Sequence, residues 1–111
     1  MIWSGSEKKI ARRAFDAAAD AALTTVMAEF KKKTAAVATP SDMWDVEDFL
    51  RQRRRELDEL LDYRYSQLVF VFGRLIHEGY LDEAQLAGLA EDKLAAIRRY
   101  LSFVDERSSR P

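Results

Sequence analysis

The sequence contains no cysteine and only one histidine, His77. Without cysteine, the chain cannot form a disulfide, a thiolate nucleophile or a Cys-ligated zinc site. One histidine also rules out, within a single chain, a metal centre built on several histidines. The Glu-x-x-His spacing of ferritin-like sites is absent too, because position 74 is an arginine. We therefore expect neither a bound metal nor any other cofactor.

An excess of charge and long apolar runs are also missing. The 18 lysines and arginines nearly balance the 19 aspartates and glutamates, which leaves a net charge of −1 at pH 7. A chain this balanced has no global field to attract nucleic acid. No apolar run approaches the roughly 20 residues that a membrane-spanning helix needs. Residues 1–6 also lack the pattern of a secretory signal. We expect a cytoplasmic protein that binds neither nucleic acid nor membrane.

The sequence lacks the motifs of the common enzyme classes. Its four glycines do not form a phosphate-binding loop, and no nucleophile elbow or metal-ligand spacing occurs. The acidic residues are numerous, but they are spread along charged faces. We expect that the protein is not an enzyme and has no catalytic residue.

Proline is scarce, and one of the two prolines marks the start of a long helical pattern. Between Thr39 and Gly79 the chain holds only Pro40, at the beginning, and one interior glycine, Gly73. Thr39 can cap a helix whose first turn accepts Pro40, and Gly79 suits a left-handed C-terminal cap. The stretch predicts a single helix of about 60 Å, at about 1.5 Å per residue. A compact domain of this length has a radius of gyration of about 13 Å, so we expect a homodimer that completes the core.

The rest of the chain also predicts helices. An alanine-rich segment, about 7–34, carries an apolar stripe and is expected to run antiparallel to the long helix. Asp82 and Gln85 resemble a capping box that starts a short helix, and Glu91 begins a last helix with an apolar stripe that includes Phe103. We expect one all-α domain over residues 1–104, an elongated helical dimer with two long antiparallel helices and two short C-terminal helices. A disordered tail is expected over 105–111.

An arginine-rich run, 51–55, admits three interpretations. A solvated helix face is the simplest, since Arg54 precedes Asp58 by four residues. Nucleic-acid binding is less consistent with the acidic residues on both sides of the run. In the third interpretation, Arg54 lies on the apolar side of the helix, is partly buried and pairs with a carboxylate. Asp48 lies six residues away on the same helix, so an Asp48–Arg54 pair would have to form between two copies.

Several large side chains in the long helical stretch are typical of interfaces. Met43 lies on the apolar stripe and is expected to be buried at the dimer seam. Trp44 shares a helix face with Asp48; a single tryptophan is more often a core residue, although tryptophan is also a common interface anchor. Phe70 lies off the main stripe, on nearly the opposite face from Phe72. An exposed phenylalanine there would indicate a partner site.

The order of these residues resembles the fluorescence recovery protein family. The resemblance is carried by the run DMWDVEDFL over 42–50 and continues without a gap to Ile97. The positions that carry it after the run include Arg54, Glu56, Asp58, Asp62, Arg64, Ser66, Phe70, Val71, Phe72, Leu75, Glu78 and Gly79. The resemblance implies a small all-helical dimer of cyanobacterial photoprotection. Such proteins bind the light-activated orange carotenoid protein, detach it from the phycobilisome and speed its return to the inactive form, without covalent chemistry.

The resemblance also implies site residues. It places the family's important patch on Trp44, Asp48 and Arg54, near the dimer interface, and a distal partner contact at Phe70. We add Met43 and Glu47, on the same helix, to this set of partner-binding or interface residues.

Two positions depart from the family pattern. Glu47 stands where the pattern has a histidine, and Ala96 stands where it has a lysine. Both changes alter a surface meant for a charged partner. They leave open an alternative, in which the same helical dimer is an interaction module for a different partner in an organism without phycobilisomes.

Overall fold

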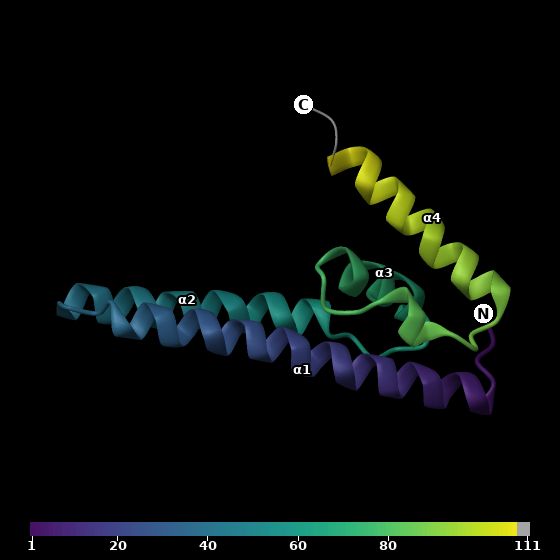
Figure 1. Cartoon of the computed structure of the whole chain (residues 1–111), viewed down its shortest axis with the longest axis horizontal. Helices are drawn as coiled ribbons and strands as arrows, with labels where there is room; N and C mark the ends of the chain where they lie inside the picture. Colours follow the sequence, from purple (N-terminus) through teal and green to yellow (C-terminus); the bar gives the residue numbers. More distant parts are fainter. Residues whose placement is uncertain (109–111) are drawn as a thin grey trace.

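The computed structural model describes residues 1–108, which are helical almost throughout and contain no strand (Figure 1). The elements in chain order are α1 (Gly5–Ala35), α2 (Pro40–Leu60), α3 (Leu68–His77), the 3-10 helix η1 (Glu83–Leu86) and α4 (Glu91–Ser108). The predicted all-α class is confirmed. The molecule is elongated, with a radius of gyration of 16.8 Å where a compact domain would have about 13 Å.

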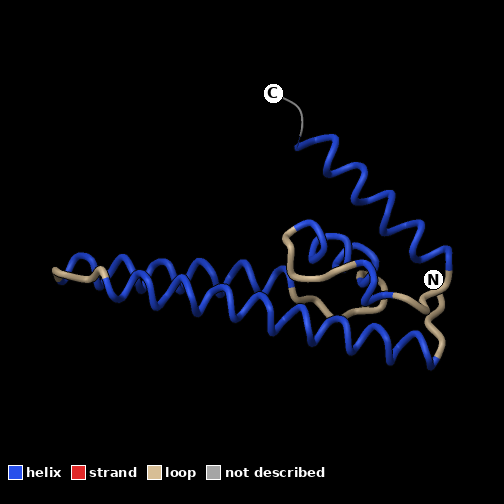
Figure 2. The backbone as a smooth tube through the Cα atoms, viewed as in Figure 1, coloured by secondary structure: helices blue, strands red, loops and turns tan. Residues whose placement is uncertain are grey.

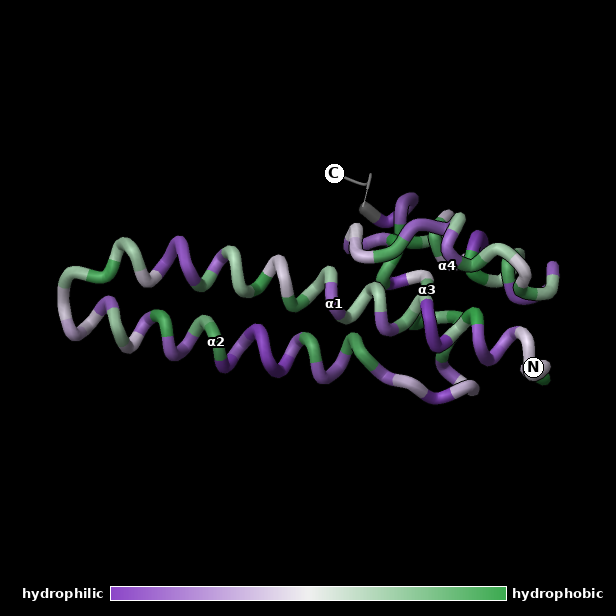
Figure 3. The backbone as a smooth tube through the Cα atoms, turned by 60° about the horizontal axis from the view of Figure 1, so that its bottom comes forward, coloured by the Kyte–Doolittle hydropathy of each residue, from purple (hydrophilic) through white to green (hydrophobic). Residues whose placement is uncertain are grey.

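The molecule has two regions of different construction. Helices α1 and α2 lie antiparallel as a long hairpin, and the outer part of the hairpin projects away from the other elements (Figure 1). We call residues 23–59 the arm and residues 1–22 and 60–108 the head. Among residues 1–108, every buried side chain belongs to the head. Apolar and polar stretches alternate along both helices of the arm (Figure 3). Because none of its side chains is buried, the arm has a line of contact between two helices, which we call the seam, but no enclosed core.

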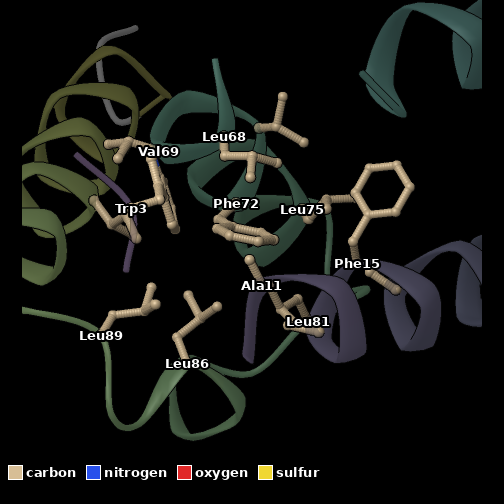
Figure 4. Packing of buried hydrophobic residues seen from close by; sticks show 14 of the residues in the cluster. Trp3, Ala11, Phe15, Leu68, Val69, Phe72, Leu75, Leu81, Leu86 and Leu89 are labelled. Carbon is tan, nitrogen blue, oxygen red and sulfur yellow. The ribbon is translucent and has the colours of Figure 1, made fainter. Parts of the chain in front are cut away.

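The core of the head is centred on α3 (Figure 4). Phe72, Leu68 and Leu75 of this helix are completely buried, and they pack with side chains from α1, η1 and the segment around Leu81. The first half of α1 contributes mainly small side chains to this core, namely Ala11, Ala14 and Ala18, besides Phe15. Because alanine is small, α3 and η1 can approach the backbone of α1 closely.

Both long helices begin with a capping box, and the one at Thr39 was predicted as a cap. Ser4 and Glu7 form a capping box at the start of α1, and Thr39 and Asp42 form a second one at the start of α2. Gly79 follows α3 with a φ of 85°, a left-handed conformation that glycine adopts without a steric cost. The start of α2 and the glycine after α3 therefore lie where the sequence predicted them, and α1 begins at Gly5, two residues before its predicted start.

The prediction of one helix from Thr39 to Gly79 is wrong. Helix α2 ends at Leu60, and residues 61–67 form a loop before α3 (Figure 2). In this loop Tyr63 packs edge-on against Phe15, with ring centroids 4.9 Å apart, and Tyr65 contacts Trp3 at 5.9 Å. A continuous helix would turn these two tyrosines about 200° apart, so it could not direct both toward α1 and the N-terminal segment. Aromatic packing therefore overrides a local helical tendency.

The C-terminal elements differ from the prediction in length. Asp82 and Gln85 do form a capping box, but the element it starts, η1, ends at Leu86. Helix α4 continues to Ser108, beyond the boundary predicted at residue 104. Residues 109–111 of the predicted tail lie outside the described residues.

Candidate protein-interaction surfaces

The described part of the chain contains neither a membrane-spanning helix nor a cluster of metal-binding side chains. No helix within residues 1–108 is both long enough and apolar enough to cross a membrane. Over the same residues, no group of three or more His, Cys, Asp or Glu side chains is arranged to hold a metal ion. The features that remain are exposed apolar surfaces, one on the arm and one on the head.

The arm exposes large apolar side chains on both of its helices. Where α1 meets α2, half-buried residues form the seam: Val26, Phe30, Val46, Phe49 and Leu57. Outside the seam, the exposed large apolar residues of the arm are Leu23, Met27, Val37, Met43, Trp44 and Leu50. Large apolar side chains that gather on a surface mark interaction sites.

The exposed side chains of the arm are not randomly placed around the hairpin. Successive residues of a helix are turned by about 100°. Counted in this way, Leu23 and Met27 are rotated away from the seam side of α1. Met43 and Leu50 are rotated away from the seam side of α2 in the same sense. In an antiparallel pair this displacement puts all four on one side of the hairpin, which we call the arm surface. Trp44, which is 58% exposed, points away from α1.

The charged site residues of α2 are exposed in a single chain. Glu47 accepts a hydrogen bond from Arg51 at 2.6 Å. Asp48 and Arg54 are both exposed, and neither forms an ion pair within residues 1–108. Partial burial of Arg54, one of the three interpretations of the run, does not occur within a single chain and stays a prediction for the dimer, in which its proposed carboxylate partner lies on the second copy. The phase of the helix places Arg54 beside the arm surface, and no second element of this chain covers that side.

The half-buried arginine of the run is Arg53. Its guanidinium bonds Glu56 on the same helix at 2.6 Å and reaches Glu29 of α1 at 3.3 Å across the seam. The hydrogen bond to Glu56, with a further contribution from Glu29, raises the pKa of Arg53. Arg53 therefore links the two helices of the arm, whereas Arg54 forms no ion pair with Asp58 four residues along the helix.

The second surface is a groove between α3 and α4. Phe70 is 54% exposed, as its position off the main stripe predicted, and it packs edge-on against Tyr100 with centroids 6.3 Å apart. The groove has a volume of about 660 Å³ and is lined by Met1, Tyr65, Ser66, Val69, Phe70, Ala96, Arg99, Tyr100 and Phe103. Phe70 and Ala96, which lie on different helices, thus belong to one surface.

A close helix contact lies beside the groove, at Tyr100. Gly73 of α3 faces the ring of Tyr100 on α4 so closely that a β-carbon at position 73 would overlap the ring. The absence of a side chain at Gly73 therefore lets α4 approach α3. Sequence reasoning treated Gly73 only as an interior glycine of a helix, and the partner ring lies too far along the chain to be predicted.

The six site residues predicted from the sequence divide between the two surfaces. Met43, Trp44, Glu47, Asp48 and Arg54 lie on α2 in the arm, and Phe70 lies alone in the head. Two exposed residues of α1, Leu23 and Met27, were missed; their spacing of four residues was the available signal. Phe103, which the sequence placed on the apolar stripe of the last helix, is exposed and lines the groove.

Comparisons with known proteins agree with this architecture. The family model described as photoprotection regulator fluorescence recovery protein matches residues 3–101. The fluorescence recovery protein of Synechocystis sp. is 32% identical over 96 residues, which cover 86% of this chain and 88% of that protein. The solved structure of the Fremyella diplosiphon fluorescence recovery protein has a TM-score of 0.85 at 35% identity and covers 92% of this chain and 99% of its own. The Synechocystis structure gives 0.86 at 31% identity, with coverages of 91% and 99%. This chain therefore belongs to the fluorescence recovery protein family of photoprotection regulators.

Proposed function

We propose that this protein binds the light-activated form of an orange carotenoid protein and accelerates its return to the inactive form, which ends phycobilisome quenching. The observation that carries the proposal is the family match over residues 3–101. The exposure of Trp44, Asp48, Arg54 and Phe70 supports it, because a residue that contacts a partner has to be accessible in the free protein.

We propose further that the protein acts as a homodimer joined through the arm surface. The arm buries none of its side chains completely within one chain, and an apolar surface on both helices fits a second copy of the same arm. Helix dimers of this kind are stabilised mainly by burial of such side chains. Asp48 and Arg54 lie about 120° apart around α2 when counted along the helix, so their proposed pairing takes place between subunits.

The proposed activity requires no covalent step. A protein accelerates the relaxation of a partner if it binds the arrangement that leads to the inactive form better than it binds the open, active one. The groove beside Phe70 offers an apolar contact for such binding. No group of the protein has to be protonated, reduced or coordinated to a metal for this mechanism.

The test is to mix the purified protein with light-converted carotenoid protein and to follow the red-to-orange absorbance change in the dark. We expect a faster relaxation, and co-migration of the two proteins on a sizing column. Phe70→Ala should reduce both effects while leaving the mass of the dimer unchanged, because Phe70 is outside the arm. An unchanged relaxation rate at excess protein, without co-migration, would reject this role for the partner tested.

A second candidate function is an interaction module of the same fold for a different partner. Two observations favour it. Glu47 engages Arg51, so the arm carries an acid–base pair where the family pattern has a histidine, and Ala96 leaves the groove without the family's lysine. Glu47→His combined with Ala96→Lys separates the candidates: restored binding of a carotenoid protein would assign the loss to these two side chains, and continued absence of binding would favour another partner.

A further inference from the structure

The head buries two charged side chains, and they face each other. Glu7 of α1 and Lys93 of α4 are the buried charged residues of the described part of the chain. The Lys93 Nζ atom lies 3.0 Å from Glu7 Oε2. Removing two charges from water is unfavourable unless their geometry and additional hydrogen bonds compensate. Neither residue lines the groove or the arm surface, so their burial calls for a separate explanation.

Further contacts surround this pair. Lys93 donates a hydrogen bond to the carbonyl oxygen of Ile2 at 2.7 Å, and its ammonium lies 5.0 Å from the ring centre of Trp3. The Glu7 carboxylate accepts hydrogen bonds from the backbone N–H of Ser4 at 3.0 Å and from that of Ala90 at 2.9 Å. A buried network whose members are satisfied is rigid. This one ties the N-terminal segment to the first turn of α4.

Helix α4 has a second attachment, to α3. The Tyr100 ring packs against Gly73, and α3 is the element that α4 contacts most. Beyond these contacts α4 extends away from α1 and α2, while the N-terminus of the chain lies beside its first turn (Figure 1). The angle between α3 and α4 therefore depends on the packing of α4 against α3, to which the Tyr100–Phe70 contact and the fully buried Ile97 also contribute, and on the network at the first turn of α4.

We propose that the Glu7–Lys93 pair is a positioning clamp that sets the angle of α4 against α3 and hence the shape of the groove beside Phe70. Trp3 extends the clamp to the other side of the groove, because its Nε1–H donates to the carbonyl oxygen of Tyr65 at 3.2 Å and Tyr65 lines the groove. The clamp acts through α4 and touches no partner itself. The consequence for a partner rests on the proposed function, whereas the position of α4 can be measured without one.

The first test measures the separation of α3 and α4 with two spin labels. Since the chain has no cysteine, Arg74→Cys and Ser102→Cys introduce the only labelling sites, both at exposed positions. Lys93→Met keeps an unbranched side chain, one atom shorter, and removes its charge. We expect a narrow distance distribution in the parent protein and a broadened or shifted one in Lys93→Met. The matched control is Arg98→Met, on the same helix, which removes exposed ion pairs to Glu83 and Glu91 and should leave the distribution narrow.

A second variant covers the case in which Lys93→Met does not fold, because it leaves the Glu7 carboxylate buried without its cation. Glu7→Gln combined with Lys93→Met leaves neither of these two positions with a buried, unpaired charge. Circular dichroism then verifies the helix content, and the same broadening is expected. A narrow, unshifted distribution in this folded double variant, or in folded Lys93→Met, would overturn the proposed clamp.

The last measurement is the affinity of the variants for light-converted carotenoid protein. If α4 occupies its position in only a tenth of the molecules, the apparent affinity falls about tenfold, while the dimer mass stays constant because the arm is intact. Unchanged affinity together with a broadened distance distribution would reject the clamp as a positioning element for the partner. If the parent protein itself binds no carotenoid protein, the proposed function fails, and the spin-label distances still decide whether the clamp positions α4.

Discussion

Helix α1 passes through both the head and the arm, and its two halves have different surroundings. In the head, its inward side chains include Ala11 and Ala18, which are buried because α3 and η1 close over them. In the arm, larger residues such as Val26 are only half-buried, and Leu23 is exposed. The same spacing of apolar residues along α1 therefore gives a core where several elements pack together, but only a seam where two helices meet. Size and hydrophobicity of a side chain therefore do not determine its burial; the number of neighbouring elements does.

This difference separates the roles of the two regions. The head buries its apolar side chains within one chain, so its stability should be largely independent of protein concentration. The arm leaves large apolar side chains exposed, so its stability should depend on a second molecule. Substitutions in the head are therefore expected to change the unfolding free energy of one chain, and substitutions in the arm to change the dissociation constant of the dimer.

The largest effect is expected from Phe72→Ala in the head. Phe72 is completely buried at the centre of the core, and removal of a buried aromatic ring typically costs about 3–5 kcal/mol of the free energy of unfolding. The matched substitution in the arm, Leu23→Ala, removes an exposed side chain and should change the unfolding free energy of the monomer by about 0.5 kcal/mol or less. Urea unfolding at a concentration that keeps the protein monomeric measures both. Equal losses would show that the arm is not an independent surface.

A somewhat smaller effect is expected from Met43→Glu in the arm, this time on association. Met43 is 49% exposed in one chain, and a carboxylate placed there would be buried without a partner in the proposed dimer. We expect the dissociation constant of the dimer to rise at least about hundredfold, or about 3 kcal/mol, with unchanged helix content. Light scattering over a concentration series gives the constant, and Met43→Leu is the control. A monomer mass for the parent protein at micromolar concentration would contradict the dimer itself.

The sequence predicted those features whose signals are close together in the chain. The cap at Thr39 and the left-handed Gly79 each depend on a few neighbouring residues, and both are present. The break between α2 and α3 was not predicted, because no proline or glycine marks it. It depends on Tyr65 meeting Trp3, which is 62 residues away.

The same limit applies to the candidate sites. The phase of the helix sufficed to predict that Phe70 is exposed, since α3 presents its opposite face to the core. For Arg54 the phase places the side chain beside the arm surface, and its burial stays a prediction, because it depends on a covering element that a single chain does not provide. The Glu7–Lys93 pair could not be predicted from spacing at all, since 86 residues separate the two side chains (93 − 7).

A smaller effect is expected from the proposed pairing of Asp48 with Arg54 across the dimer. Asp48→Leu and Arg54→Leu should each weaken the dimer, and a double-mutant cycle should give a coupling energy of about 0.5–3 kcal/mol. An exposed pair would give about 1 kcal/mol or less, and strong coupling would therefore also indicate burial between subunits. Additive effects of the two substitutions would show that the side chains do not interact.

The two regions also contain the same acidic motif in different surroundings. Each long helix begins with a capping box, and its acid is buried in the head as Glu7 but only half-buried at the tip of the arm as Asp42. Hydrogen bonds from the backbone N–H groups of Ala90 and Ser4, and then from Lys93, lower the pKa of Glu7 to about 2. Backbone N–H groups of Ala38 and Thr39, with the hydroxyl of Thr39, likewise lower the pKa of Asp42.

Protonation of these two acids is expected to have no effect at neutral pH and to act on different regions in acid. A carboxyl with a lower pKa in the folded than in the unfolded state stabilises the fold above its unfolded pKa, and this contribution is lost as the pH falls through the folded value. The contribution of Glu7 to the stability of the fold should therefore be complete above about pH 4.5 and decline toward pH 2. The contribution of Asp42 should decline below pH 3.8.

Amide hydrogen exchange at pH 6 and pH 3 shows which region loses stability when each acid is protonated. Glu7→Gln should reduce protection at the start of α4 at pH 6 and make it less sensitive to acid, and Asp42→Asn should do the same at the start of α2 alone. Loss of protection in the head of Asp42→Asn would mean that the tip of the arm and the head unfold together, contrary to their separate packing.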